Sequence, residues 1–319
     1  MQEPLLDTEA LVATGRWLTA QGYRFTTVSP ATHARVNARA PGLQARSLRD
    51  VFGWSRPFAP GLLSADSMDS LQRRGLLVPA EAGLVRSRVR FSSVGELLFA
   101  HSAYPTLEAD AVFFGPDTYR FVSLIEAELA RQRLPAGARI LDMGCGAGPG
   151  GIAAAQLAGA LRPELVLADI NAQALRHAAA NAELAGVVRV ELAQGDLFAA
   201  VDGQFDFVVS NPPYLNDSTQ RTYRHGGGPW GGGLSERIVR EGLPRLAPGG
   251  RLVLYTGAAM VDGTDPLLEA LAPGLLAMGW PWTYRELDPD VFGEELEQPA
   301  YAGAERIAAV ALVVQRPAP

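Results

Sequence analysis

The sequence contains no lysine, so all 28 of its basic residues are arginine. Lysine forms the Schiff base of imine-forming enzymes, and it is the phosphate-binding residue of the Walker-type loop. Its absence excludes both kinds of site from this chain.

Cysteine and long apolar segments are also scarce. Cys145 is the one cysteine, which excludes a disulfide framework. No apolar run approaches the roughly 18 residues that a membrane-spanning helix needs. Glu3, Asp7 and Glu9 stand before the first apolar stretch, which is the wrong charge for a secretory signal peptide. We therefore expect a soluble, cytoplasmic protein with no membrane partner.

The abundant residues predict a globular chain with an uneven charge. The 319 residues are 48% hydrophobic and 19% charged, which is enough apolar material for a large core. The net charge is −6, yet residues 1–90 hold 12 arginines against 7 acidic residues. A basic front end on an acidic body favours an anionic partner for the front, although an ordinary arginine-rich surface explains it equally well.

Strand and helix patterns alternate beyond residue 110, which is typical of a parallel sheet covered on both faces. We predict a doubly wound, mostly parallel α/β domain over 111–319, with its two last strands forming an antiparallel pair at one edge. Asp117 is placed to cap its first helix. The expected strands are 139–141, 164–168, 187–192, 205–210, 250–256, 283–287 and 306–314. The expected helices between them are 151–161, 172–185, 234–246 and 264–278.

The first 110 residues predict a smaller α+β domain. Helices are expected over 5–20 and 65–74, with irregular sequence between them and a strand over 84–91. A helix followed by a β-hairpin resembles a winged-helix module, and a small cap on the catalytic domain is the alternative. Side chains alternate along a strand, so Arg86, Arg88 and Arg90 are expected on one face as a candidate nucleic-acid contact.

A glycine-rich turn follows the strand that ends at Asp142. Gly144, Gly146 and Gly148 let the backbone turn sharply and approach a ligand closely. Gly146 and Gly148 also begin a match to the dinucleotide fingerprint, so a nicotinamide cofactor fits this turn. However, the charge of Asp142 opposes a phosphate and suits a cation, such as the amino and sulfonium groups of S-adenosylmethionine.

Two further acidic residues lie where a nucleoside cofactor would meet them. Asp169 ends the next strand, 21 residues beyond Gly148, where a carboxylate accepts hydrogen bonds from ribose hydroxyls. Asp196 follows the third strand. Taken alone, Asp196 is a turn residue, and Asp169 suits a nicotinamide dinucleotide equally well.

The tetrapeptide Asn211-Pro212-Pro213-Tyr214 follows another buried strand. The two prolines remove two N–H donors and stiffen the turn, so that the Pro212 carbonyl is free to face a ligand. Together with the Asn211 side-chain oxygen, this carbonyl can accept both hydrogens of a planar NH2 group, while Tyr214 provides a flat stacking surface. The nitrogen lone pair is then directed at an electrophile, and the rate gain comes from positioning.

The glycine turn, Asp169, Asp196 and the tetrapeptide together resemble the class I methyltransferases that modify planar nitrogens. This group includes adenine-N6 enzymes, guanine-N2 enzymes and release factor glutamine methyltransferases, with a seven-stranded Rossmann-like sheet and S-adenosylmethionine as cofactor. The resemblance implies catalysis by Asn211, Pro212, Pro213 and Tyr214. It implies cofactor binding by Asp142, Gly144, Cys145, Gly146, Gly148, Asp169, Ile170, Asp196, Leu197 and Asn211, without a metal.

The acceptor stays open between a protein glutamine and a nucleobase. Asn211, the Pro116-Asp117-Thr118 segment and the glycine-rich loop over 226–233 resemble the glutamine enzymes. The six glycines of this loop predict a mobile segment that contacts the substrate as a lid. The basic front end favours RNA or DNA. We interpret His225 as a surface residue of that loop. A nicotinamide-dependent oxidoreductase and a non-catalytic nucleic-acid-binding protein are the two rival functions.

Overall fold

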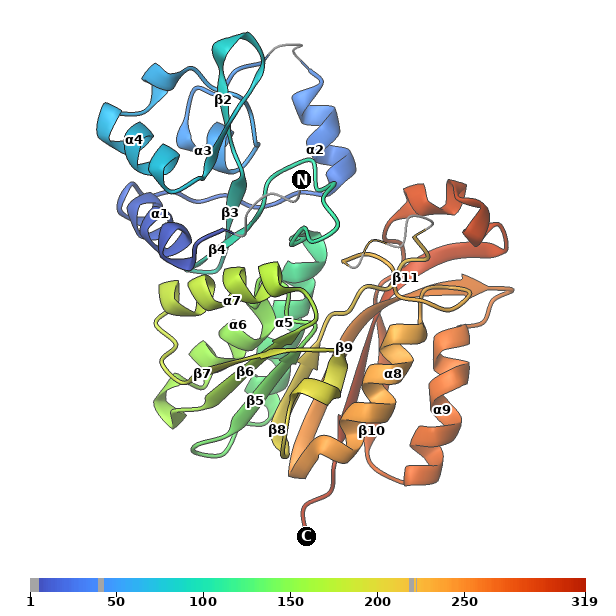
Figure 1. Ribbon diagram of the computed structural model, residues 1–319. Helices are drawn as coiled ribbons and strands as arrows, with labels where there is room; N and C mark the ends of the chain where they lie inside the picture. Colours follow the sequence, from blue (N-terminus) through green and yellow to red (C-terminus); the bar gives the residue numbers. More distant parts are fainter. Residues whose placement is uncertain (1–5, 40–42, 218–220, 222) are drawn as a thin grey trace.

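A seven-stranded sheet forms the centre of the computed structural model, which describes residues 6–39, 43–217, 221 and 223–319 (Figure 1). The strand order is β10-β11-β9-β8-β5-β6-β7. All neighbouring strands are parallel except that β11 runs antiparallel to both β9 and β10. The predicted doubly wound, mostly parallel fold with an antiparallel edge is therefore confirmed. The strands are β5 Arg139–Met143, β6 Glu164–Asp169, β7 Val190–Gln194, β8 Phe205–Ser210, β9 Leu246–Val261, β10 Trp282–Asp288 and β11 Ala304–Gln315.

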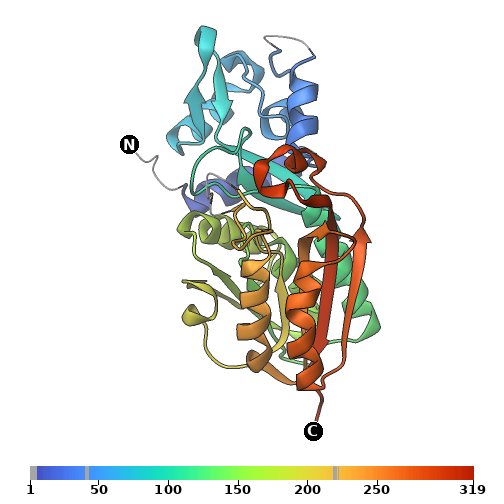
Figure 2. The ribbon, with the colours of Figure 1, turned by 90° about the vertical axis from the view of Figure 1, so that its right-hand side faces the viewer.

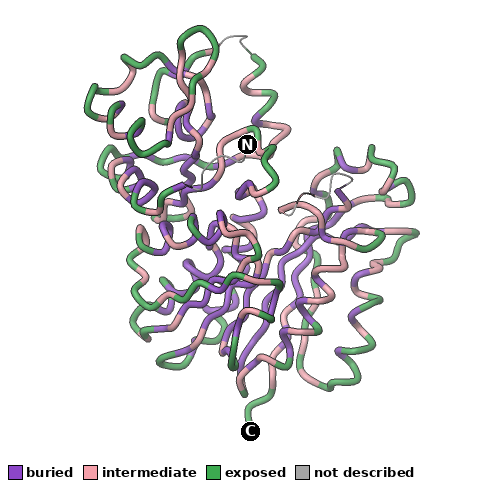
Figure 3. Tube along the Cα trace, in the orientation of Figure 1, coloured by how far each residue is buried: buried purple, intermediate pink, exposed green. Residues whose placement is uncertain are grey.

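Helices cover both faces of this sheet because side chains along its strands alternate between two apolar cores. Ile140 packs in the core beneath one set of helices, and the next residue, Leu141, packs in the core beneath the other set. Figure 3 shows the buried residues concentrated along the strands between the two layers. The first layer holds α5 Pro116–Arg131, α6 Pro149–Leu157 and α7 Ala172–Leu184, and the second holds α8 Gly233–Gly242 and α9 Pro266–Met278. Among the described residues, no helix has the length and apolarity to cross a bilayer.

Several ends differ from the predicted ones. The strand expected over 187–192 begins only at Val190, and the strand expected over 250–256 is longer at both ends. The helix expected over 234–246 ends at Gly242, since Pro244 cannot continue the backbone hydrogen bonding of a helix.

The N-terminal elements pack around an apolar core of their own, which includes Leu11, Phe52, Phe58 and Phe91. They stand above the sheet, with α1 lying along α7 (Figures 1 and 2). The division of the chain at residue 110 stays a prediction. The elements are α1 Thr8–Ala20, α2 Pro30–Asn37, α3 Leu48–Phe52, α4 Ala65–Arg73, β1 Leu77–Pro79, β2 Val85–Ser87, β3 Val89–Val94 and β4 Leu97–Ser102.

The single strand expected over 84–91 is interrupted, and the arginine face predicted on it as a nucleic-acid contact is wrong at Arg90. The strand breaks at Arg88: β2 pairs with β1, whereas β3 pairs with β4 in a separate ribbon. Arg90 is only 3% exposed because the ribbon is covered on both faces, and its Nε donates to the Ser102 carbonyl. Burial lowers the pKa of Arg90 to about 10. Arg90 is therefore no surface contact for a nucleic acid.

Candidate active site

A cavity of about 410 Å3 lies at the carboxyl edge of the parallel strands, between the ends of β5 and β8. The chain leaves β5 toward β6 on one side and returns to β8 on the other, and open α/β sheets bind ligands at such a switch point. Gly148 alone among the predicted residues is absent from the lining, because it begins α6 and faces Ile152. The predicted residues that line the cavity are Asp142, Gly144, Cys145, Gly146, Asp169, Ile170, Asp196, Leu197, Asn211, Pro212, Pro213 and Tyr214.

The glycine turn presents bare backbone to this cavity. Gly144, Gly146 and Gly148 have φ angles of 68°, 53° and 79°, which favour glycine. A Cβ added at Gly144 or Gly146 would have no described atom within 4 Å, so the space beside them is open. The thiol of Cys145 is buried, and burial raises its pKa well above the usual range, which disfavours a nucleophilic role.

Asp142 joins the end of β5 to the start of α6, on either side of the glycine turn. Its carboxyl group is 1% exposed, and one oxygen accepts a hydrogen bond of 2.7 Å from the Gly151 amide in the first turn of α6. Burial raises the pKa of Asp142 to about 7, the Gly151 hydrogen bond opposes this shift, and the charge of Asp169 adds to it. The carboxyl group therefore both positions α6 and changes its charge near neutral pH.

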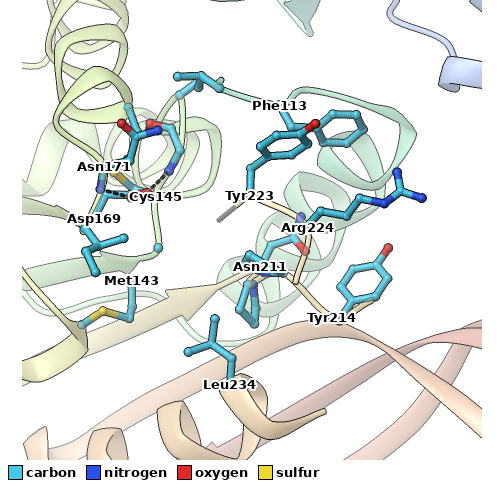
Figure 4. A pocket seen from close by; sticks show the side chains of 18 of the residues that line it. Phe113, Met143, Cys145, Asp169, Asn171, Asn211, Tyr214, Tyr223, Arg224 and Leu234 are labelled. Atoms are coloured by element: carbon cyan, nitrogen blue, oxygen red, sulfur yellow. Dashed lines mark hydrogen bonds between the residues drawn. The ribbon is translucent and has the colours of Figure 1, made fainter. Parts of the chain in front are cut away.

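Asp169 closes one side of the cavity and holds two backbone amides. Its oxygens accept hydrogen bonds of 2.8 Å from Gly146 and from Asn171, which fix the turn relative to the end of β6 (Figure 4). Burial raises its pKa despite these bonds. Ile170, beside it, is 56% exposed and offers an apolar surface at the cavity edge.

Asp196 and Leu197 lie at the outer rim of the cavity. The Asp196 side chain is 59% exposed, and Arg237 contacts it at 3.1 Å. Leu197 follows with a φ of 47°, which places it at the start of a short 3-10 turn. Asp196 is thus an accessible carboxylate that already has one cationic neighbour.

The tetrapeptide Asn211–Tyr214 borders the cavity beyond the end of β8. Ser210 anchors it, because its hydroxyl donates to the Met143 carbonyl at the end of β5 over 2.7 Å. The Asn211 side-chain amide lines the cavity and makes no hydrogen bond to another described residue. Figure 4 shows Asn211 between Asp169 on one side and Tyr214 on the other. The side-chain oxygen of Asn211 is therefore free to accept a hydrogen bond from the NH2 group of a ligand.

Asp117 holds the ring of Tyr214, a role that the sequence did not predict. Gly115 is the N-cap of α5, so the expectation that Asp117 caps this helix is wrong. Its carboxylate is 6% exposed and accepts hydrogen bonds from the Tyr214 hydroxyl at 2.6 Å and the Tyr255 hydroxyl at 2.7 Å. Arg120 balances the charge at 3.2 Å. The tip of Tyr214 is thereby fixed, and its ring flanks the cavity.

The segment after the tetrapeptide folds back over the cavity. The Tyr223 ring stacks on Phe113 with an interplanar angle of 13°, and its hydroxyl donates to the Thr106 carbonyl at 2.7 Å. His225 also lines the cavity, and its Nδ1 is buried without a partner among the described residues. The interpretation of His225 as a surface residue is therefore wrong. Arg224, which lines the cavity too, is bound to Glu295.

Glycine is required in this segment for close backbone contact. Gly226 donates to the Leu215 carbonyl at 2.8 Å, and Leu215 donates to the Arg224 carbonyl at 3.1 Å. A Cβ at Gly226 would lie 2.0 Å from the Gly231 carbonyl oxygen, which no side chain tolerates. The proposed movement of the 226–233 loop as a lid stays a prediction.

A family model described as the methyltransferase small domain matches residues 123–261. This interval begins within α5 and ends with β9. It contains the glycine turn, Asp169, Asp196 and the tetrapeptide, which are the features that line the cavity.

Curated relatives match the chain to different extents. The release factor glutamine methyltransferase of Deinococcus radiodurans is 31% identical over 242 residues, covering 72% of this chain and 77% of the relative. The ribosomal RNA small subunit methyltransferase C of Chromohalobacter salexigens is 39% identical over 124 residues, covering 39% of this chain but only 33% of the relative. Among solved structures, the tRNA m1G37 methyltransferase of M. jannaschii has a TM-score of 0.47 and 14% identity, over 74% of this chain and 61% of that one.

Proposed function

The chain belongs to the family of methyltransferases that includes the release factor glutamine methyltransferases, and from this premise we propose that it methylates a planar nitrogen of a macromolecule with S-adenosylmethionine. The observation that carries the acceptor chemistry is the free amide of Asn211 at the switch-point cavity. Relatives with this chemistry are named for ribosomal RNA and for a release factor. Nucleobases with an exocyclic amino group and the side-chain amide of glutamine both offer a planar NH2 group.

The residues that line the cavity fit S-adenosylmethionine. Open space beside Gly144 and Gly146 accommodates a ligand against bare backbone. Asp169 still has lone pairs for ribose hydroxyls, and the buried carboxyl of Asp142 complements a cation. When bound, the cofactor supplies an electrophilic methyl group on a sulfonium sulfur.

The tetrapeptide prepares the acceptor. The Asn211 side-chain oxygen and the Pro212 carbonyl accept the two hydrogens of the NH2 group, while the ring of Tyr214 supports its plane. The nitrogen lone pair would then be directed at the methyl group that the bound cofactor would supply, with the sulfide as its leaving group. The methylated nitrogen afterwards releases a proton to water, so no general base has to act before the transfer.

Transfer of labelled methyl from S-adenosylmethionine in a cell lysate tests this function. We expect label in macromolecular material with the wild-type protein and about 100-fold less, at equal times, with Asn211→Ala. Separate digestion of the product with nuclease and with protease then identifies the acceptor. Retention of all label in the soluble cofactor pool, with a folded wild-type protein, would refute the proposed activity.

Replacing Asp169 by alanine is expected to weaken S-adenosylmethionine binding by about 1.5–3 kcal/mol, the usual contribution of hydrogen bonds to a charged group. The loss has two sources, the ribose contacts and the two amides that Asp169 holds in place. Isothermal titration calorimetry measures it. Asp169→Asn keeps one acceptor oxygen and should lose less cofactor affinity than Asp169→Ala. Equal affinity of Asp169→Ala and wild type would remove Asp169 from the cofactor site.

Cofactor affinity should also increase with pH, because Asp142 has a pKa raised to about 7. A cationic ligand binds the carboxylate form, so we expect affinity to rise by up to about tenfold from roughly pH 6 to pH 8.

The same raised pKa of Asp142 makes the folded state bind a proton that the unfolded state has released, so folding stability should decrease as pH rises from about 4 to 7.

Asp142→Asn is the matched control for this pH dependence. Its side-chain oxygen can still accept the hydrogen bond from Gly151, but the group no longer titrates. The amino group of S-adenosylmethionine titrates in both proteins, so only the difference between their pH profiles reports Asp142. Identical profiles for wild type and Asp142→Asn would show that Asp142 is not the titrating group.

A further inference from the structure

Positive charge is concentrated in one segment of the N-terminal elements. Between residues 10 and 65 the chain has seven arginines and a single acidic residue, Asp50. Three of these arginines are paired in the structure: Arg16 with Glu183, Arg24 with Glu96, and Arg56 with Asp50. The four that remain are Arg35, Arg39, Arg46 and Arg49.

These four residues, called the arginine patch below, are all exposed, and none has an ion pair with a described residue. Arg35 and Arg39 belong to α2 and the turn after it, while Arg46 and Arg49 flank the start of α3 at Ser47. The positive end of a helix dipole repels cations. Helix stability therefore does not account for Arg46, whereas Arg49 lies in the last turn of α3 and over the Phe25 ring, 5.9 Å from its centroid.

The two halves of the patch sit on one cross-linked platform. The Trp54 carbonyl accepts hydrogen bonds from His33 at 2.8 Å and from Asn37 at 3.0 Å, which joins α2 to the segment after α3. Arg56 donates to Asn37 at 3.0 Å and is also paired with Asp50. The helices α2 and α3, which carry two of the four arginines and lie beside the other two, are thus held in a defined arrangement.

The platform is linked to the cavity through residues 104–113. His33 of α2 stacks on Tyr104 with ring centroids 4.0 Å apart. Two residues later, the Thr106 carbonyl accepts the hydroxyl of Tyr223, whose ring stacks on Phe113 at the cavity. Figures 1 and 2 both show α2 above the carboxyl edge of the sheet.

Several other basic residues of the region are engaged within the fold. Arg88 donates to the Gly75 carbonyl, and Arg90 is buried. On α4, Asp66 and Asp69 offset the cations, and Arg73 is paired with Asp69 at 2.9 Å. The winged-helix expectation would place a nucleic acid on this helix and hairpin, where five arginines stand against three acidic residues, but the excess of positive charge is larger in the segment that contains α2 and α3.

We propose that the arginine patch binds the phosphate backbone of a nucleic acid whose base is methylated in the cavity; this rests on the proposed function. Guanidinium groups bind phosphates in a bidentate manner. A protein partner would be expected to meet an apolar interface centre. No large apolar side chain of the described residues between 30 and 56 is among the strongly exposed ones. A glutamine acceptor is therefore the alternative outcome of the test.

Full-length variants with two arginines removed test the patch. Arg35→Ala/Arg39→Ala and Arg46→Ala/Arg49→Ala each remove two charges that have no ion-pair partner among the described residues. The control, Arg24→Ala/Arg73→Ala, removes two paired charges from the N-terminal region. The probes are a fluorescein-labelled single-stranded RNA of about 20 nucleotides and the DNA of the same sequence, titrated from roughly 50 to 200 mM NaCl.

Each patch variant should bind RNA about tenfold more weakly than wild type. Its slope of log affinity against log salt should shrink by up to about 0.7 for each phosphate that the variant no longer neutralises. The control should stay within about twofold of wild type. Tighter binding of the RNA probe or of the DNA probe identifies which nucleic acid supplies the phosphate backbone. The proposal would be overturned if the control variant lost as much affinity for RNA as the patch variants. It would also be overturned if an acidic poly-glutamate peptide bound the patch and nucleic acid did not.

Two readouts separate this proposal from the proposed function. Asn211→Ala should bind RNA like wild type, so loss of methyl transfer alone leaves the patch intact. If wild type transfers no methyl group but the patch variants still bind RNA more weakly, the proposed activity fails and the binding surface stands. If only protease releases the label and the patch variants methylate at the wild-type rate, the nucleic-acid substrate is refuted.

Discussion

Replacing Asn211 by alanine is expected to lower the methylation rate by about 100-fold or more, the effect of removing one oriented polar group from a transition state. Cofactor affinity should change little. The Asn211 side-chain amide makes no hydrogen bond to another described residue, so its removal breaks no bond that supports the described fold. The expected loss is therefore catalytic: the acceptor NH2 group loses one of the two oxygens that orient it.

Single-turnover methylation with saturating cofactor measures this rate, and calorimetry measures the affinity for S-adenosylmethionine. Asn211→Asp is the matched comparison, because it keeps an acceptor oxygen of the same reach and should retain more activity than alanine. Wild-type turnover by a folded Asn211→Ala protein would show that the tetrapeptide is only a rigid turn.

The sheet was predictable because its signals are local. The parallel strands β5, β6 and β8 are short apolar runs that end beside a glycine, an acidic residue or the Asn211–Tyr214 tetrapeptide, and each predicted strand overlaps the observed one. The elements α2, α3 and β4 were missed because their local sequence signals are weak. α3 has five residues, too few for an apolar period to appear, and irregular sequence was expected over the region that contains α2.

The predicted arginine contact failed at Arg90 because a strand pattern gives the alternation of faces but not what covers them. Val89 and Phe91 are buried on one face, but so is Arg90 on the opposite face. That face meets residues from far along the chain: the His101 ring of the paired strand stacks on Phe114 at 4.8 Å. Sequence periodicity carries no information about such a cover.

Some residues of the candidate site were likewise predictable from the sequence, and others were not. The glycine turn and the tetrapeptide are contiguous in sequence, so their position at the cavity was predictable. Asp117 is 97 residues from Tyr214 and 138 from Tyr255, and only the fold brings them together. In the sequence, Asp117 has the ordinary signature of an acidic residue in the first turn of a helix.

Asp117→Asn is expected to reduce both stability and turnover. Two tyrosine hydroxyls and Arg120 share this buried carboxylate, so removing its charge should destabilise the fold by about 2–4 kcal/mol. The Tyr214 ring then loses its anchor beside Asn211, which should lower kcat by roughly tenfold or more, since small displacements at a reacting centre are costly. Thermal unfolding and steady-state kinetics measure the two effects.

Two tyrosine variants separate positioning from stability. Tyr214→Phe and Tyr255→Phe each remove one hydrogen bond to the same Asp117 carboxylate, but only Tyr214 lines the cavity. If Asp117 acts by holding the Tyr214 ring, Tyr214→Phe should lower kcat with little change in KM, and Tyr255→Phe should lose stability while keeping its rate. Equal kcat values for the two variants would reduce Asp117 to a stabilising residue of the core, because the ring at the cavity would then not need its anchor.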